Sequence, residues 1–177
     1  MRSCDFTAPE TWHEPVGEES PKYVVQTAGP GFVHPVTHDE IKERLADLAP
    51  ALVEPLEVVQ LSTMTRKRKL FPCYGMQWGP NIYLYPIEES LVEVYSRTPR
   101  PEQLVEAKMF GGVWSQSGKQ WHLSWTEAGI KDFYLNNVLI HELGHVLDTR
   151  NTNSEARERY AIWFATEYGY RASRGRR

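Results

Sequence analysis

The spacing of apolar residues changes along the chain and divides it into an N-terminal arm, a β-rich middle and a helical end. Residues 1–37 contain five prolines and few aliphatic side chains, so we expect an extended, flexible arm that the fold does not need. Apolar residues from Ile41 to Leu48 then recur at helical spacing. This pattern predicts a short amphipathic helix with Thr37 as its N-cap and Pro50 at its end.

The middle of the chain is rich in β-branched and aromatic residues, which favour strands. The expected strands are residues 56–64, 70–74 and 81–85, and Gly75, Gly79 and Pro80 mark a loop between the last two. A helix should then begin near Pro101 and end before two glycines at 111–112.

A β-hairpin is expected next, because Ser117 and Gly118 separate two strand-like runs at 113–116 and 119–125. A two-residue turn at these positions would place Trp114 opposite Trp121, which is a favourable cross-strand aromatic pair.

The last ~50 residues carry helical spacing in two pieces, with a break near Thr149 to Asn153. Thr152 and Glu155 have the spacing of a capping box at the start of the second piece. Together these elements predict a single α+β domain over residues 38–170, with a small twisted sheet packed beside the two C-terminal helices. Residues 171–177 should form a basic tail.

Composition narrows the class of protein. With 177 residues and 41% hydrophobic residues the chain can bury one core, which excludes a fibre and a fully disordered chain. A net charge of -3 gives no general attraction to nucleic acid or to an anionic membrane, and no apolar run is long enough to span a bilayer. We therefore expect a cytoplasmic monomer whose two cysteines are reduced thiols. The basic run 66–69 should be a solvated turn.

One motif points to chemistry. His141 and His145 stand four residues apart on a predicted helix, so their imidazoles share one face and can bind a common zinc ion. Apolar residues such as Leu139 and Leu143 lie on the other side and anchor that helix to a core. Glu142, next to a ligand, is placed to act as the general base toward a water molecule.

A third zinc ligand must come from elsewhere, and the following helix offers Glu155, Glu158 and Glu167. In a tight antiparallel helical hairpin Glu158 lies nearly level with His145, whereas Glu167 is too far along the helix. Small residues on the Glu158 face allow the two helices to approach closely. Glu158 is therefore the expected ligand, with Glu155, Asp148 and His122 as alternatives.

The run from His141 to His145, followed by Glu158-Arg159-Tyr160-Ala161-Ile162-Trp163-Phe164-Ala165, resembles the gluzincin metallopeptidases and most of all their small ImmA/IrrE-like members. The family pattern is HExxH followed by E-x-x-A-N-x-F-A, and Ile162 stands where that pattern has Asn. The resemblance covers residues from about 137 to 166. It implies one zinc ion held by His141, His145 and Glu158, with Glu142 as the base.

Three further residues are candidates for secondary roles. Asp148 shares the helical face of the two histidines and would either orient a ligand imidazole or simply be solvated. Tyr134 lies two turns upstream and would line the pocket or belong to the core. His122, on the expected hairpin, would donate to a transition-state oxyanion or be merely half-buried.

These observations favour a zinc-dependent peptidase, an endopeptidase rather than an exopeptidase, whose partner is a peptide or protein substrate. A substrate strand would pair with a sheet edge, for which the hairpin around Trp114 is the expected place. Two alternatives remain open. One is a DNA-associated zinc protease that uses the basic runs, and the other is a non-catalytic zinc-bound interaction module.

Overall fold

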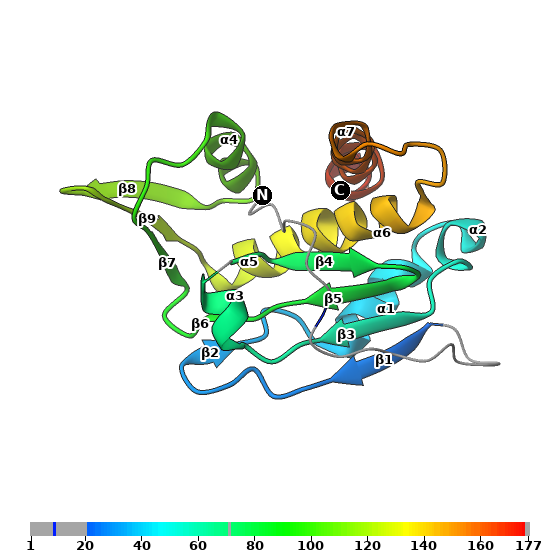
Figure 1. Cartoon of the computed structure of the whole chain (residues 1–177), viewed down its shortest axis with the longest axis horizontal. Coiled ribbons are helices and arrows are strands. Elements are labelled where there is room, and N and C mark those ends of the chain that lie inside the picture. Colours follow the sequence, from blue (N-terminus) through cyan, green and yellow to red (C-terminus); the bar gives the residue numbers. More distant parts are fainter. Residues whose placement is uncertain (1–8, 10–20, 71, 176–177) are drawn as a thin grey trace.

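The structure is a computed structural model that describes residue 9, residues 21–70 and residues 72–175. It combines helices with small sheets, so the predicted α+β class is confirmed (Figure 1). The strands are β1 (Lys22–Val25), β2 (Phe32–Val33), β3 (Val58–Leu61), β4 (Gly75–Trp78), β5 (Asn81–Leu84), β6 (Ile87–Glu88), β7 (Val92–Tyr95), β8 (Val113–Ser117) and β9 (Gln120–Ser124). The α-helices are α1 (His38–Ala46), α2 (Pro50–Val53), α3 (Arg66–Leu70), α4 (Pro101–Met109), α5 (Glu127–Phe133), α6 (Leu139–Leu147), α7 (Ser154–Phe164) and α8 (Ala172–Gly175), and two π-helical segments are η1 (Tyr134–Val138) and η2 (Ala165–Arg171).

The central sheet has four strands in the order β1-β3-β5-β4, so β4 is one of its outer strands. β1, β3 and β5 run parallel, and β4 pairs antiparallel with β5. Every residue of β3 and β5 is buried, as expected for strands that are covered on both faces. α6 contacts β4, β5 and α7, and it lies between the sheet and α7 (Figure 1).

The main core joins this sheet to the helices. It contains Leu56 and Ile82 from the sheet region, Tyr134 from η1, and Leu139 and Leu143 from α6, all with no exposed surface. Burial of such side chains is the main stabilising contribution to folding. The back of α6 is therefore fixed against the sheet, as its apolar residues predicted.

The N-terminal boundary differs from the expectation. β1, inside the predicted flexible arm, pairs in parallel with β3 over four residues, from Lys22 opposite Val58 to Val25 opposite Leu61. The folded part of the chain therefore begins well before residue 38. Residues 1–8 and 10–20 of the predicted arm lie outside the described residues. At the other end, the predicted tail is helical as far as Gly175, the last described residue.

The first predicted helix is confirmed at its start. Thr37 is the N-cap of α1, and its side chain and that of Glu40 form a reciprocal capping box. The helix ends earlier than expected, at Ala46. Pro50 opens the short helix α2 instead of closing α1, which suits a residue that lacks a backbone N–H.

The predicted strand at 70–74 is wrong. Arg66–Leu70 forms helix α3, and the strand is β4, which occupies part of the predicted loop. The basic run is also not a solvated turn, because Arg68 is 2% exposed and its guanidinium lies over the ring of Tyr85, 4.7 Å from the ring centre. The neighbouring Cys73 is disulfide-bonded, not a reduced thiol. Cys4, the only other cysteine of the sequence, lies outside the described residues.

A second sheet contains β7, β9 and β8, in that order. β8 and β9 form the predicted hairpin, but Ser117 pairs with Gln120, so the turn residues are Gly118 and Lys119. Trp114 consequently lies opposite Leu123, and Trp121 lies opposite Gln116. Trp114 packs against Tyr95 of β7 instead, with 5.1 Å between the ring centres.

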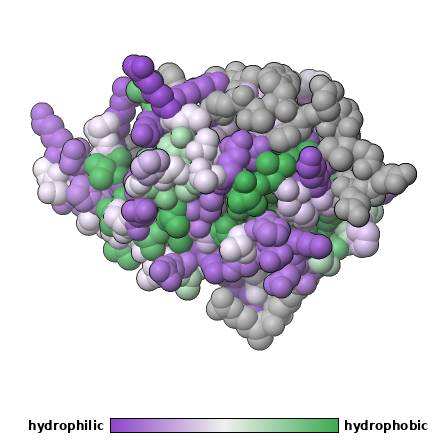
Figure 2. All heavy atoms as spheres, turned by 90° about the horizontal axis from the view of Figure 1, so that it is seen from below, coloured by the Kyte–Doolittle hydropathy of each residue, from purple (hydrophilic) through white to green (hydrophobic). Residues whose placement is uncertain are grey.

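The surface of the molecule is mixed in character. In Figure 2 hydrophobic areas are separated by hydrophilic residues on the face seen there. Within the described part of the chain, no helix has the length and apolar character needed to cross a membrane.

Candidate metal centre

The HExxH motif lies on helix α6, and its polar residues meet neighbouring elements of the fold. His141 and Glu142 are 2% and 4% exposed, although both are polar. Buried polar groups are costly unless they have partners. The two residues therefore need partners from other elements, and α7 and β4 supply them.

Helix α7 approaches α6 closely where both helices carry small residues. A Cβ atom added to Gly144 would lie 3.1 Å from the Cα atom of Ala161 and 3.1 Å from the Cβ atom of Phe164. Gly144 thus faces α7, and Ala161 has the role that the sequence predicted for a small residue on this face. Glu158 precedes Ala161 by one turn on α7 and is brought beside the histidines.

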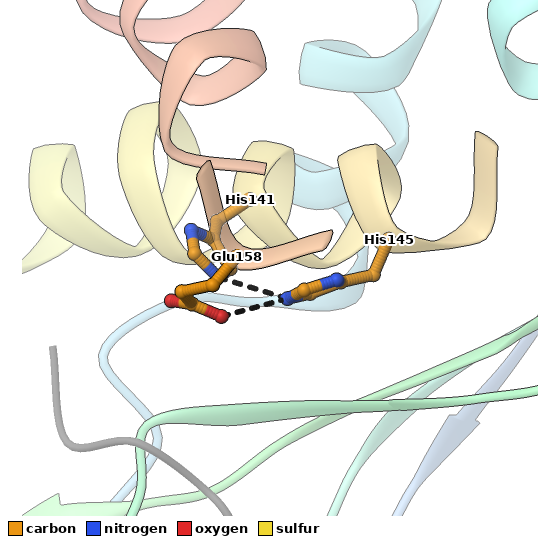
Figure 3. A group of neighbouring side chains, drawn as sticks. All are labelled: His141, His145 and Glu158. Carbon is orange, nitrogen blue, oxygen red and sulfur yellow. Dashed lines mark hydrogen bonds and ion pairs between the residues drawn. The ribbon is translucent and has the colours of Figure 1, made fainter. Parts of the chain in front are cut away.

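The three predicted ligands converge, with their side chains pointing toward one another from α6 and α7 (Figure 3). His141 Nε2 lies 3.2 Å from Glu158 Oε1, and His145 Nε2 lies 3.2 Å from Glu158 Oε2. The two Nε2 atoms are 3.2 Å apart. All three residues thus present a possible ligand atom to the same point in space.

The expected capping box of Thr152 and Glu155 would give Glu155 a structural role at the start of the second C-terminal helix. That box is absent: the N-cap of α7 is Asn153, whose side chain accepts from the backbone N–H of Ala156. Glu155 is exposed and forms a 3.9 Å ion pair with Arg159. Glu155 therefore lies away from the histidines for a different reason from the predicted one.

The Glu158 carboxyl and the His141 imidazole each shift the pKa of the other. Burial by itself would raise the pKa of the Glu158 carboxyl, but hydrogen bonds and charge interactions with His141 and His145 hold that pKa well below its ordinary value. Burial would lower the pKa of His141, but the hydrogen bond with Glu158 and the nearby carboxylates raise it. Glu158 is consequently an anion at neutral pH, which a metal ligand of this type must be.

Glu142 lies against strand β4. A Cβ atom at Gly75 would be 3.0 Å from Glu142 Cγ and 3.3 Å from Glu142 Oε1, so glycine leaves the space for this side chain. Burial raises the pKa of the Glu142 carboxyl, while the two histidines and a hydrogen bond from the backbone of Gln77 act in the opposite direction. A buried carboxyl beside a group that could hold a metal ion is a candidate general base.

Arg157 supports the site, although the sequence analysis did not single it out. Its guanidinium donates to the backbone carbonyls of His145 and Asp148 at 3.2 and 3.3 Å. It also reaches the side-chain oxygen of Gln77 at 3.4 Å. One side chain of α7 thereby holds both the C-terminal end of α6, where a positive charge is favourable, and strand β4.

Asp148 has a structural role. Its carboxylate accepts hydrogen bonds from the backbone N–H and the side chain of Asn151 and from the backbone N–H of Arg150. Burial would raise the pKa of Asp148, but these hydrogen bonds, with those of Asn151 foremost, lower it. Asp148 thus organises the turn between α6 and α7, and its recorded partners do not include a ligand imidazole.

The other two secondary candidates are placed elsewhere. Tyr134 has no exposed surface, and its hydroxyl donates to the backbone carbonyl of Tyr85 at 2.6 Å, so it is a core residue. His122 lies in β9, opposite Val94 and Ser115 in the second sheet. Neither joins the group formed by His141, His145 and Glu158.

Two imidazole nitrogens and one carboxylate form a donor set that suits zinc, and three protein ligands leave a position for water. Ligand distances of about 2.0–2.1 Å around a tetrahedral zinc ion correspond to about 3.3 Å between neighbouring ligand atoms. The 3.2 Å between the two Nε2 atoms is close to that value. The two 3.2 Å contacts of Glu158 use different oxygens, and one ligand atom from each of the three residues lies within 4.8 Å of the others. Calcium and magnesium prefer all-oxygen sites, so the imidazoles favour a transition metal.

No protein-family model matches the sequence, and no curated protein or solved structure matches it either. The resemblance to the gluzincins therefore rests on the motif residues and on the position of Glu158.

Proposed function

We propose that the protein is a zinc-dependent endopeptidase of the gluzincin type. The observation that carries this proposal is the convergence of His141, His145 and Glu158, with 3.2 Å between the atoms that face one another, beside the buried carboxyl of Glu142. An amphipathic helix with two solvated histidines would require neither the close approach of α7 nor the burial of Glu142.

In this proposal His141, His145 and Glu158 hold one zinc ion. Zinc with three protein ligands polarises a carbonyl oxygen and lowers the pKa of water to near neutrality. The Glu142 carboxylate takes the proton of the attacking water and passes it to the leaving amine. A hydrogen bond from the backbone of Gln77 holds that carboxylate in position, and the absence of a side chain at Gly75 leaves room for it.

The proposed substrate is a peptide or an unfolded protein. The proposed reacting groups lie at the α6–α7 crossing beside β4, whereas the β8–β9 hairpin that the sequence favoured for a substrate strand belongs to the second sheet. The nucleic-acid alternative gains no support from the two C-terminal arginines that the structure describes. Arg171 pairs with Glu167, and Arg174 pairs with Asp132 and lies over the ring of Tyr170.

Glu142→Gln tests the proposal most directly. The amide keeps the size of the side chain but cannot take a proton, so we expect the variant to bind one zinc ion and to lose at least about 100-fold in hydrolysis. The measurement is cleavage of unfolded, fluorescently labelled casein, together with elemental analysis of bound metal. Glu155→Gln, on the exposed face of α7, is the matched control and should keep both activity and zinc.

Two results would contradict the proposal in different ways. A protein that binds no transition metal after zinc addition would exclude the metal centre itself. A protein that binds zinc through these three residues but cleaves no unfolded protein would instead be the non-catalytic zinc-bound module.

A further inference from the structure

A narrow cavity lies between helix α4, the second sheet and the end of α5. Its walls are mainly aromatic, with contributions from Tyr74, Tyr95, Trp114, Trp125 and Phe133. The space between these side chains that atoms do not fill is about 210 Å³, including the part open to solvent. The room for the centre of a water-sized group is only about 10 Å³, which is enough for about one such group and too little for a ring.

Two carboxylates accompany the aromatic walls. Glu106 of α4 lines the cavity directly. Glu93 of β7 has no exposed surface, and it accepts hydrogen bonds from Tyr74 Oη at 2.6 Å and from Trp125 Nε1 at 2.9 Å. None of the described residues that line the cavity is basic.

Aromatic rings and carboxylates together attract cations. A ring attracts a positive charge through its quadrupole, and a carboxylate adds a charge-assisted hydrogen bond. A primary ammonium group is compact and carries three donors, whereas a guanidinium group is a wide planar fork. The narrow shape of the cavity therefore favours ammonium.

The cavity adjoins the metal centre. Glu106 Oε1 accepts a 2.5 Å hydrogen bond from Asn137 Nδ2, and Asn137 precedes His141 by one helical turn. Tyr74, which also lines the cavity, directly precedes Gly75, the residue against which Glu142 packs.

We propose that this cavity binds the primary ammonium group of a ligand beside the metal centre. That the ligand is a peptide substrate rests on the proposed peptidase function. Two sources of ammonium then exist: the side chain of a lysine and the free N-terminus of a peptide. A bound N-terminus would make the enzyme an aminopeptidase instead of an endopeptidase.

Binding can be measured without turnover in the zinc-loaded Glu142→Gln variant by isothermal titration calorimetry. Three five-residue alanine peptides serve as probes: one acetylated with a central lysine, one acetylated with a central norleucine, and the norleucine peptide with a free N-terminus. We expect one ammonium-bearing peptide to bind at least about tenfold more tightly than the acetylated norleucine peptide. The peptide that does so identifies the source.

A second set of variants places the binding in the cavity. Glu106→Gln keeps the size of the side chain and an acceptor for Asn137, and it should reduce the ammonium preference about tenfold. Glu102→Gln, exposed on the same helix, is the matched control and should leave the preference unchanged. Trp114→Leu removes one aromatic wall of the cavity, so it should reduce the preference without changing zinc content.

The outcomes separate this inference from the proposed function. Equal binding of all three peptides, or the same loss in Glu102→Gln as in Glu106→Gln, overturns the cavity assignment even if the protein hydrolyses peptides. An ammonium preference that depends on Glu106 supports the assignment even if no hydrolysis is found, in which case only the peptidase proposal fails.

Discussion

Two glutamates three positions apart on α7 have different environments. Glu158 meets both histidines, whereas Glu155 points to solvent and pairs with Arg159. Three residues correspond to about 300° of helical rotation, so the two side chains point about 60° apart, and Glu155 lies on the exposed flank of α7 while Glu158 lies toward α6. The candidate metal centre therefore depends on the orientation of α7, a helix that begins after its N-cap Asn153.

The first prediction concerns zinc affinity at these two positions. Glu158→Gln replaces an anionic ligand with a neutral amide, so zinc affinity should fall by more than about 100-fold. Glu155→Gln should change it by less than about twofold, because an exposed surface ion pair contributes little. Competition with a chelator at fixed pH measures both. A larger loss for Glu155→Gln would reverse the ligand assignment.

The residues of this centre were predictable to different degrees. The histidines follow from their i, i+4 spacing, and Glu158 follows from the expected helical hairpin with small residues on one face. Gly75 and Arg157 left no comparable signal. Their roles arise from contacts between β4, α6 and α7, and a single sequence does not reveal which elements meet.

At the scale of elements, two crossings hold the C-terminal helices together. The first is the contact of Gly144 with Ala161 beside the candidate metal centre. The second is between η1 and η2, where a Cβ atom at Gly169 would lie only 2.0 Å from the carbonyl oxygen of Asn136. The second contact involves backbone on both sides, so a small shift of a side chain cannot relieve it.

Gly169→Ala should therefore destabilise the protein. Alanine favours a helix by about 1 kcal/mol over glycine, but the overlap must separate η1 from η2, and we expect a net loss of at least about 2 kcal/mol. Urea unfolding measures the loss. Gly144→Ala is the comparison, because the closest contacts of its added Cβ atom are at 3.1 Å. Its stability cost should be smaller than that of Gly169→Ala, and its effect on zinc affinity should be larger. A Gly169→Ala variant as stable as the wild type would show that η1 and η2 can move apart at little cost in free energy.

The hairpin shows why some elements were predicted only in part. The expected pairing of Trp114 with Trp121 and the observed pairing of Gln116 with Trp121 differ by two residues. A shift of two leaves every side chain on the same face of the sheet, so alternation fits both registers equally well. Only the position of the turn distinguishes them, and Gly118 with its positive φ of 61° begins that turn.

At the scale of the whole molecule, the largest difference from expectation is the place of β1. The run Lys22–Val25 contains Tyr23 and two valines, which favour a strand, but prolines and glycines surround it and obscure that signal. Its partner β3 lies more than thirty residues away in the sequence. Parallel pairing over such a separation has no local signature, unlike the hairpin.

The last prediction tests this part of the fold by truncation. Removal of residues 1–30 deletes β1, the contacts of Tyr23 with the core and the hydrogen bond from Thr63 N–H to Gln26 Oε1. A variant without residues 1–20 is the matched control, because it keeps β1 whole and also lacks Cys4. The longer truncation should be less stable than the shorter one by at least about 2 kcal/mol, through lost ladder hydrogen bonds and exposed apolar surface. For a chain of this size the melting temperatures should then differ by roughly 4–8 °C. Equal melting temperatures would mean that β1 adds little to the sheet, and the folded unit would then begin near the originally expected boundary at residue 38.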